Sequence, residues 1–212
     1  MVAIDLKSLI NRLDDHCRRA LDAAIGLTVS RTHYNVEIEH WLVKLAEGTD
    51  TDVAAIFRQY DIDHGRFLSD LNRGLDKMKT GNSRVPSLSP EIVDLSKQAW
   101  LMASVDQGLS RIRSGHLLWA LLADETLARR AREASGQLLK IQPDILKRDM
   151  AVITANSIEA QSAPAAVHGP IPNAPGADGV APTRRHPRRR RSARRVPRRS
   201  ASPTAAWFFL RR

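Results

Sequence analysis

The chain has 212 residues, of which 42% are hydrophobic, and its formal net charge is +10 at pH 7. Residues 184–212 hold 12 arginines and no acidic residue, so the preceding part is slightly acidic, with 21 basic against 23 acidic side chains. A single cysteine, Cys17, excludes an internal disulfide and a cysteine-rich zinc site. The N-terminus lacks the apolar core of a signal peptide, and no run approaches the ~18 apolar residues of a membrane span. We therefore expect a cytoplasmic protein without a membrane partner.

Apolar residues recur every three or four positions in the first half, which predicts a series of short amphipathic helices. The opening helix, behind Asp5, would bury Leu6, Leu9, Ile10 and Leu13. Asp14 and Asp15 would cap a longer helix that ends near Thr32, and Asp63 would cap the last helix of this half. The expected inner faces are Cys17, Ala20, Leu21, Ala24 and Val29, then Val53, Ile56, Phe57 and Tyr60, then Phe67, Leu68, Leu71, Leu75 and Met78.

The second half follows a polar connection, residues 79–88, and opens with a strong helix start. Ser89 is a preferred N-cap, Pro90 suits the first helical position, and Glu91 faces the positive end of the helix dipole. The expected inner faces are Ile92, Leu95, Ala99, Met102 and Ala103, then Leu127 and Ala131, then residues 138–141, then Ile145, Leu146, Met150 and Ile153. No run alternates with β-branched enrichment, so we predict an all-α protein.

Two segments of the chain are copies of each other. Superposing His116 on His40, an offset of 76 positions, also places Leu118 on Leu42, Leu121 on Leu45 and Ile112 on Val36. Each copy predicts a short helix with one buried stripe. Ser114 is a candidate N-cap for the second copy, whereas the first has Ile38 there and must be capped in another way. Three tryptophans are expected in the core: Trp41, Trp100 and Trp119.

Neither histidine of the repeat has the neighbours that chemistry would need. No metal ligand stands at suitable spacing on the helix of His40 or His116, and Glu39-His40 lacks the second histidine of a His-Glu-x-x-His motif. The Asp-Asp-His-Cys run at residues 14–17 invites a metal interpretation, but consecutive helical side chains point in different directions. We interpret that run as capping and surface charge, and expect structural histidines, no catalytic residue, no metal and no cofactor.

The composition changes at Ser157. Residues 157–183 are rich in Pro, Ala and Gly and too poor in large apolar residues to offset the entropy of ordering, which predicts a flexible linker. Residues 184–212 form an Arg-rich tail, predicted to be disordered, that contains an incongruous Trp-Phe-Phe-Leu run. The folded part is expected over residues 1–156, with repeats at about 5–79 and 88–156.

The two histidine segments, each followed by leucines at helical spacing, resemble the double N-terminal domain of the Clp unfoldases. In that family two four-helix repeats pack by pseudo-twofold symmetry. The resemblance covers roughly residues 5–156. The extra opening helix, the Glu-His-Trp-Leu sequence at 39–42 and residues 110–118 most resemble the ClpV (TssH) ATPases, which disassemble the contracted sheath of type VI secretion.

The resemblance implies a docking module that captures an N-terminal amphipathic helix of a sheath subunit in an apolar groove. We expect this groove between the opening helix and the start of the second repeat. The candidate contact residues are Leu9, Leu13, Cys17 and Ala20 on one wall and Leu88, Ile92 and Leu95 on the other, with Asp22 or Arg84 at a polar rim. Apolar residues at helical spacing are more often core than ligand contacts, so each assignment competes with a purely structural role.

The sequence departs from that family in one respect: it contains no Gly-x-x-x-x-Gly-Lys-Ser/Thr motif to hold nucleotide phosphates. We therefore expect no ATP hydrolysis by this chain, and a monomer, because the ring-forming ATPase modules are absent. One hypothesis is a truncated or frameshifted, non-functional remnant whose tail is read out of frame. Sequencing the locus tests it, because an ATPase-coding segment should then lie just downstream in another frame.

The Arg-rich tail supports an alternative function. Twelve guanidinium groups within residues 184–212 could bind nucleic acid weakly and without sequence preference. A third hypothesis is an adaptor that competes with a full-length unfoldase for its client. Deleting residues 177–212 separates the first two functions, because helix docking should survive the deletion and nucleic-acid binding should not.

Overall fold

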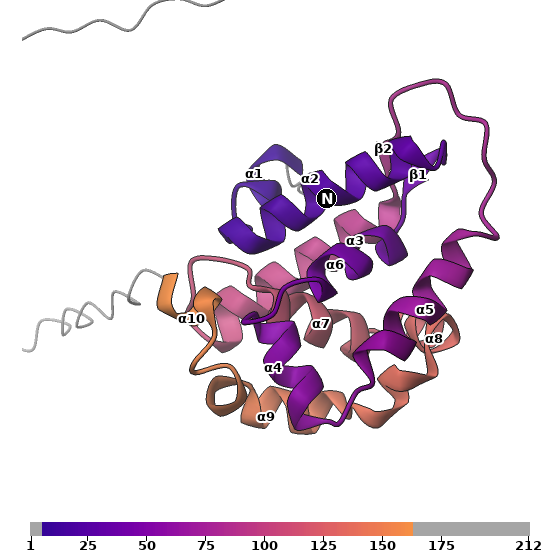
Figure 1. Ribbon diagram of the computed structural model, residues 1–212. Coiled ribbons are helices and arrows are strands. Elements are labelled where there is room, and N and C mark those ends of the chain that lie inside the picture. The colour runs from indigo at the N-terminus through magenta and orange to yellow at the C-terminus, as the bar shows by residue number, and fades with distance from the viewer. Residues whose placement is uncertain (1–5, 163–212) are drawn as a thin grey trace, which may run out of the picture. The chain divides into compact units, whose positions relative to one another are not determined.

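The computed structural model describes residues 6–162, in which short helices follow one another with few residues between them (Figure 1). The first half comprises α1 (Leu6–Ile10), α2 (Asp15–Ser30), β1 (Asn35–Val36), α3 (Ile38–Ala46), α4 (Asp52–Gln59) and α5 (His64–Leu75). The second comprises β2 (Ser87–Leu88), α6 (Pro90–Leu101), a π-helical turn (Met102–Asp106), α7 (Ser114–Ala123), α8 (Glu125–Ala134), a 3-10 helix (Gly136–Lys140), α9 (Pro143–Ile153) and α10 (Ile158–Ser162). The predicted helical fold is confirmed, with α2–α5 and α6–α9 as its two four-helix repeats.

The helices begin where their capping residues predict. The carboxylate of Asp14 accepts a hydrogen bond from the backbone N–H of Cys17 at 2.7 Å, and that of Asp63 accepts from Arg66 at 2.9 Å. The hydroxyl of Ser89 accepts from the third residue of its helix, with proline at the first helical position. These contacts satisfy N–H groups that the first turn leaves without an intrahelical partner.

Ser114 is an exception, because it is the first residue of α7 and not its cap. Arg113 occupies the cap position, and the Ser114 hydroxyl instead donates to Glu159 and accepts from the backbone N–H of Val53. The predicted capping role of Ser114 is therefore wrong. Its side chain joins three separate parts of the domain.

The two repeats are joined by reciprocal pairing of short extended segments. β1 and β2 run parallel, with Val36 opposite Leu88, and a second parallel bridge joins Leu13 to Ile112. Val36 and Ile112 are the equivalent positions of the internal repeat, so each repeat pairs the residue before its central helix with the start of the other repeat. These strands are only two residues long, too short to produce an alternating pattern of apolar and polar residues.

The central helices of the repeats, α3 and α7, lie at the middle of the core. Every residue of α7 from Ser114 to Leu122 is buried, and in α3 only Lys44 is not fully buried. The predicted single buried stripe is therefore wrong for both helices, because neighbours cover them on all sides. α2 packs on α3, and α6 packs on α7 (Figure 1).

Further predictions need correction. Leu6, Leu139 and Ile145 were expected to face inward but are 37%, 66% and 36% exposed. Val29 is 56% exposed, whereas Thr28 is buried and donates its hydroxyl to the carbonyl of Ala24, so α2 turns a different residue inward at its end. The predicted linker starts at residue 157, but residues 158–162 form helix α10, which buries Glu159. Three predicted features lie outside the described residues: the cap Asp5, residues 163–183 of the linker, and the Arg-rich tail. Between residues 6 and 162 no helix is long and apolar enough to cross a membrane.

Candidate functional site

The histidines of the internal repeat have the structural role expected for them. The Nδ1 atoms of His40 and His116 accept hydrogen bonds from the backbone N–H groups of Glu37 and Arg113, each at 3.0 Å. This fixes the neutral tautomer with its proton on Nε2, which faces His33 Nδ1 at 2.8 Å in one repeat and the Gln107 carbonyl oxygen at 3.0 Å in the other.

Burial lowers the pKa of His40 to about 4 and the pKa of His116 to about 3. Neighbouring positive charge acts in the same direction, from His33 on His40 and from Arg113 on His116. Both rings are therefore neutral near pH 7. In that state each ring stabilises the start of a central helix, α3 or α7, by accepting the N–H of the residue that precedes the helix.

The predicted contact residues of the docking groove lie inside the core. Six of the seven are at most 5% exposed: Leu9, Leu13, Cys17, Ala20, Ile92 and Leu95. α1 lies against α6, so the two predicted walls contact each other. Their burial contradicts the prediction that these side chains line an open groove, because a partner could reach them only if α1 moved.

Leu88, the seventh predicted contact residue, is half-buried. It precedes the start of α6, whereas Trp100, the half-buried tryptophan of that helix, lies near its end. The helix rises about 1.5 Å per residue, so its part from Pro90 to Trp100 alone spans roughly 15 Å along its axis. Leu88 therefore belongs to the strand pair with Val36. The predicted rim residues Asp22 and Arg84 are both exposed.

Other apolar residues of α1 and of the end of α6 are exposed or half-buried. Leu6 is 37% exposed and Ile10 is half-buried on α1, while Leu101 at the end of α6 is 58% exposed. The guanidinium of Arg12 lies over the half-buried ring of Trp100, 4.7 Å from its centroid, and links the end of α1 to the end of α6. We call these five residues the α1–α6 edge.

The three tryptophans predicted to be core residues differ in exposure. Trp41 is buried, and its indole N–H donates to the carbonyl of Cys17 at 3.2 Å. Trp119 is buried too, whereas Trp100 is half-buried at the α1–α6 edge. The helical pattern alone could not separate Trp100 from the others, because the covering of its ring depends on how α1 packs.

A second candidate surface is a hollow of about 560 Å³ at the corner between α3, α4 and α5. Its apolar wall includes Ala54, Phe57 and Ile62, and Arg58 and Asp61 lie at its polar part. No sequence pattern indicates this hollow. Its lining comes from three helices and the segments between them, whose relative placement no periodicity reveals.

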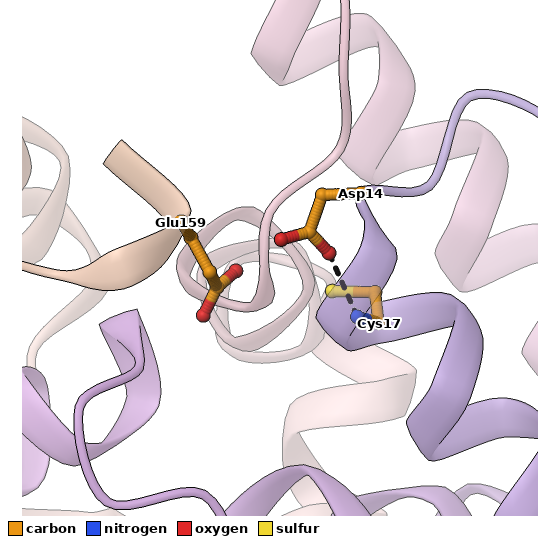
Figure 2. Close-up of side chains that lie close together, drawn as sticks. All are labelled: Asp14, Cys17 and Glu159. Carbon is orange, nitrogen blue, oxygen red and sulfur yellow. Dashed lines mark hydrogen bonds between the residues drawn. The ribbon is translucent and has the colours of Figure 1, made fainter. Parts of the chain in front are cut away.

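Asp14, Cys17 and Glu159 come together from opposite ends of the described chain (Figure 2). One possible ligand atom from each lies within 4.8 Å of the others, and all three residues are buried. The oxygens of Glu159 accept from Asp52 N–H at 2.9 Å, from the Ser114 hydroxyl at 2.5 Å and from Ser114 N–H at 2.6 Å. Hydrogen bonding thus accounts for Glu159, and the capping contact accounts for Asp14.

Beside this cluster, Arg113 and Asp52 form a buried ion pair. The guanidinium donates to both carboxylate oxygens of Asp52, at 2.8 and 2.6 Å, and also to the hydroxyl of Thr154 at 2.9 Å. Ser157 donates to the same carboxylate at 2.5 Å. Each group in this network has partners, as a buried polar network requires.

This fold and this repeat identify the class of protein. The family model of the Clp repeat (R) N-terminal domain matches residues 12–135, and the chain belongs to that family. Among curated relatives, it is 31% identical over 162 residues to the chaperone protein ClpB of Yersinia enterocolitica and 27% identical over 146 residues to the AAA+ ATPase ClpV1 of Pseudomonas aeruginosa PAO1. These matches cover 76% and 69% of this chain but only 18% and 16% of the relatives.

Within the family, the chain is homologous to ClpV1 and has the fold of a ClpV N-domain. The N-terminal domain of ClpV1 from the Sci1 type VI secretion system of E. coli EAEC is 35% identical, with a TM-score of 0.65 over 72% of this chain and 92% of that one. A structure that includes a peptide from the SciI protein of the same system is 35% identical, with a TM-score of 0.67 over 74% and 98%. The complex of a ClpV N-domain with a VipB peptide is 27% identical, with a TM-score of 0.62 over 75% and 97%.

Proposed function

We propose that this domain docks an amphipathic helix of a type VI secretion sheath subunit at the α1–α6 edge. The observation that carries the proposal is the match to ClpV N-domain structures that hold VipB and SciI peptides. Those matches span nearly the whole of the matched chains, so the docking module itself is the shared part. The proposed role is binding and involves no chemical step.

The chemistry of the α1–α6 edge suits a helix with a few apolar anchors. Leu6, Ile10, Trp100 and Leu101 offer apolar surface, and the Arg12 guanidinium supplies a polar contact beside it. A partner helix with apolar residues at i, i+3 and i+4 could cover this edge and desolvate it. The buried residues of the predicted groove, such as Leu9 and Leu95, would support the edge from beneath.

α1 itself could adjust to such a partner. It has five residues, too few for an isolated helix to be stable, and of these only Leu9 is buried. Its apolar contacts with the core are therefore few: Leu9, whose burial contributes about 1.5–3 kcal/mol, and the half-buried Ile10. Under this proposal a small shift of α1 widens the edge into a groove and leaves α2 in place.

The test is binding of a synthetic SciI peptide, followed by fluorescence anisotropy with the full chain. Leu101→Arg places a charge on the proposed surface at an exposed position, so folding should be preserved and affinity should fall at least about tenfold. The matched control is Ala54→Arg, which places the same charge in the separate hollow beside α4 and should leave affinity unchanged.

Two results would contradict this placement. If Leu101→Arg binds as well as the unaltered chain, the α1–α6 edge is not the docking surface. If Ala54→Arg alone abolishes binding, the hollow between α3, α4 and α5 is the site. If the unaltered chain does not bind the peptide at millimolar concentration, the docking function itself is wrong. Light scattering on the same samples tests the expected monomer.

A further inference from the structure

Helix α10 is held to the rest of the domain by polar contacts. Among its five residues only Glu159 is buried, at 2% exposure, while Ile158 remains 43% exposed. A helix this short has no independent stability, and it has no apolar face in the core to compensate. Its docking therefore depends on Glu159, on one backbone contact from Ile158 N–H to the carbonyl of Asp50, and on the preceding Ser157, which contacts Asp52 and Arg113.

Glu159 accepts the first backbone N–H of two other helices, α7 and α4, although Thr51 also caps α4 by accepting from the N–H of Ala54. Its carboxyl oxygens accept the first backbone N–H of α4, at Asp52, and the first backbone N–H of α7, at Ser114. The residue before α7, Arg113, has no side-chain oxygen that could accept this N–H. The closing segment of the domain thus completes two helix starts that belong to different repeats.

The surroundings of Glu159 contain more acidic than basic groups. Asp14 and the Cys17 thiol face it from α2, as Figure 2 shows, and Asp52 faces it from the start of α4. The one cation in this network is Arg113, whose guanidinium donates to both oxygens of Asp52. An ionised Glu159 would therefore add a buried negative charge beside two others, with no cation left to pair with it.

We propose that α10 is a clasp that stays docked while Glu159 carries a proton and opens when Glu159 ionises. In the docked state the three hydrogen bonds to Glu159 favour its ionised form, but burial and the two neighbouring carboxylates oppose ionisation. Opening places the ionised carboxylate in water and uncovers the first turns of α4 and α7. It also frees the chain after Ser157, and it exposes Cys17, which is fully buried while the clasp is closed.

The pKa of Glu159 supports the same direction. Burial, followed by the charges of Asp52 and Asp14, raises this pKa from 4.5 to about 8. The open state should titrate near the unperturbed value, so the opening equilibrium should increase about tenfold per pH unit between these two pKa values and then level off.

The experiment is amide hydrogen exchange of the full chain at pH 6, 7, 8 and 9, expressed as protection factors after correction for intrinsic exchange. The amides of Asp52 and Ser114 should lose protection about tenfold per pH unit up to about pH 8. The amides of Phe67 and Leu71 in α5, both buried and distant in the chain, should keep their protection. Cys17 is the single cysteine, so its maleimide labelling, scaled to the denatured chain, should accelerate in parallel.

Two variants make the result specific. Glu159→Gln cannot ionise, so its Asp52 and Ser114 amides should show no pH dependence, whatever their absolute protection. Asp14→Asn keeps a capping oxygen for Cys17 but removes one facing charge, so it should weaken the pH dependence. The proposal is overturned if protection does not change with pH, if Glu159→Gln changes as much as the unaltered chain, or if the α5 amides lose protection equally. Peptide docking at the α1–α6 edge is a separate measurement and can succeed or fail independently.

Discussion

Glu37 and Arg113 stand at equivalent positions before the central helices of the two repeats, and each pairs with the other repeat through opposite charge. Glu37 accepts from Arg130 of α8 at 3.4 Å, while Arg113 donates to Asp52 of α4 at 2.6 Å. The pseudo-twofold relation thus extends from backbone pairing to ion pairs, with the acid and the base exchanged. The two pairs differ in environment, because Arg113 and Asp52 are buried whereas Arg130 is 40% exposed.

This difference predicts unequal effects of mutation. Arg113→Ala should lower the free energy of unfolding by about 3–5 kcal/mol, because it leaves the buried carboxylate of Asp52 without its partner. Glu37→Gln should lower it by less than about 1 kcal/mol, as expected for a partly exposed pair. Urea denaturation of both variants checks this, and equal losses would show that burial does not distinguish the two pairs.

The neutral histidines predict a loss of stability in acid. The folded-state pKa values of His40 and His116 are about 4 and about 3, below the unfolded value of 6.5, so the unfolded chain binds more protons below pH 6.5. Their contribution is complete above pH 6.5 and is lost as the pH falls towards the folded values. Between pH 6.5 and 5 the loss should reach about 2 kcal/mol for each histidine.

Urea midpoints measured between pH 5 and 7 test this dependence. His116→Gln retains an acceptor and a donor but cannot titrate, so its stability should fall less steeply with acidification than that of the unaltered chain. If the variant shows the same acid dependence, His116 is not one of the responsible groups.

Two helical glycines predict opposite responses to alanine. A Cβ at Gly26 in α2 would meet nothing within 4 Å, so Gly26→Ala should stabilise the domain by about 0.5–1 kcal/mol. A Cβ at Gly115 in α7 would lie 3.0 Å from a carboxylate oxygen of Asp52, which Arg113 and Ser157 hold in place. Gly115→Ala should therefore destabilise it by about 1–3 kcal/mol.

Thermal denaturation of the two alanine variants side by side gives the comparison. A rise in melting temperature for both would mean that the Asp52 side chain can move aside, and that the Arg113–Asp52 pair is less constrained than its hydrogen bonds indicate.

The Arg-rich tail predicts a binding activity separate from docking. Deleting residues 177–212 should remove any nucleic-acid binding and leave SciI peptide affinity unchanged. The nucleic-acid affinity of the full chain should fall steeply with salt, with a slope of about −0.9 in log K for each phosphate contact on duplex DNA. Anisotropy titrations at several salt concentrations test both, and peptide binding that disappears with the tail would contradict the assignment of docking to the folded domain.

Sequence reasoning was most successful where a pattern was local. The repeat around His40 and His116 and the caps at Asp14, Asp63 and Ser89 follow from neighbouring residues, and the structure confirms them. Whether an apolar residue lies on the surface depends on packing. Leu9 and Leu95 share the helical pattern of many surface anchors, yet both are buried once α1 lies on α6.

The partners of Glu159 could not be predicted for a different reason. The composition changes at Ser157, and the residues that Glu159 contacts are about 45 and 107 positions away in the chain. A single acidic residue beside a Pro- and Ala-rich segment is typical of a solvent-exposed position, so the local sequence gives no sign that Glu159 is buried. Only the way the repeats pack brings the starts of α4 and α7 together for one carboxyl group to serve both.

The crossed pairing of Val36 with Leu88 and of Leu13 with Ile112 has a consequence for dissection of the molecule. Each half supplies an extended segment that pairs with the other half, so we expect that neither half folds alone. A protease cut at Val85, which is 89% exposed, would leave two fragments that remain associated. We therefore expect the domain to be suited to split-protein complementation, in which two separately expressed fragments fold only when they bind each other.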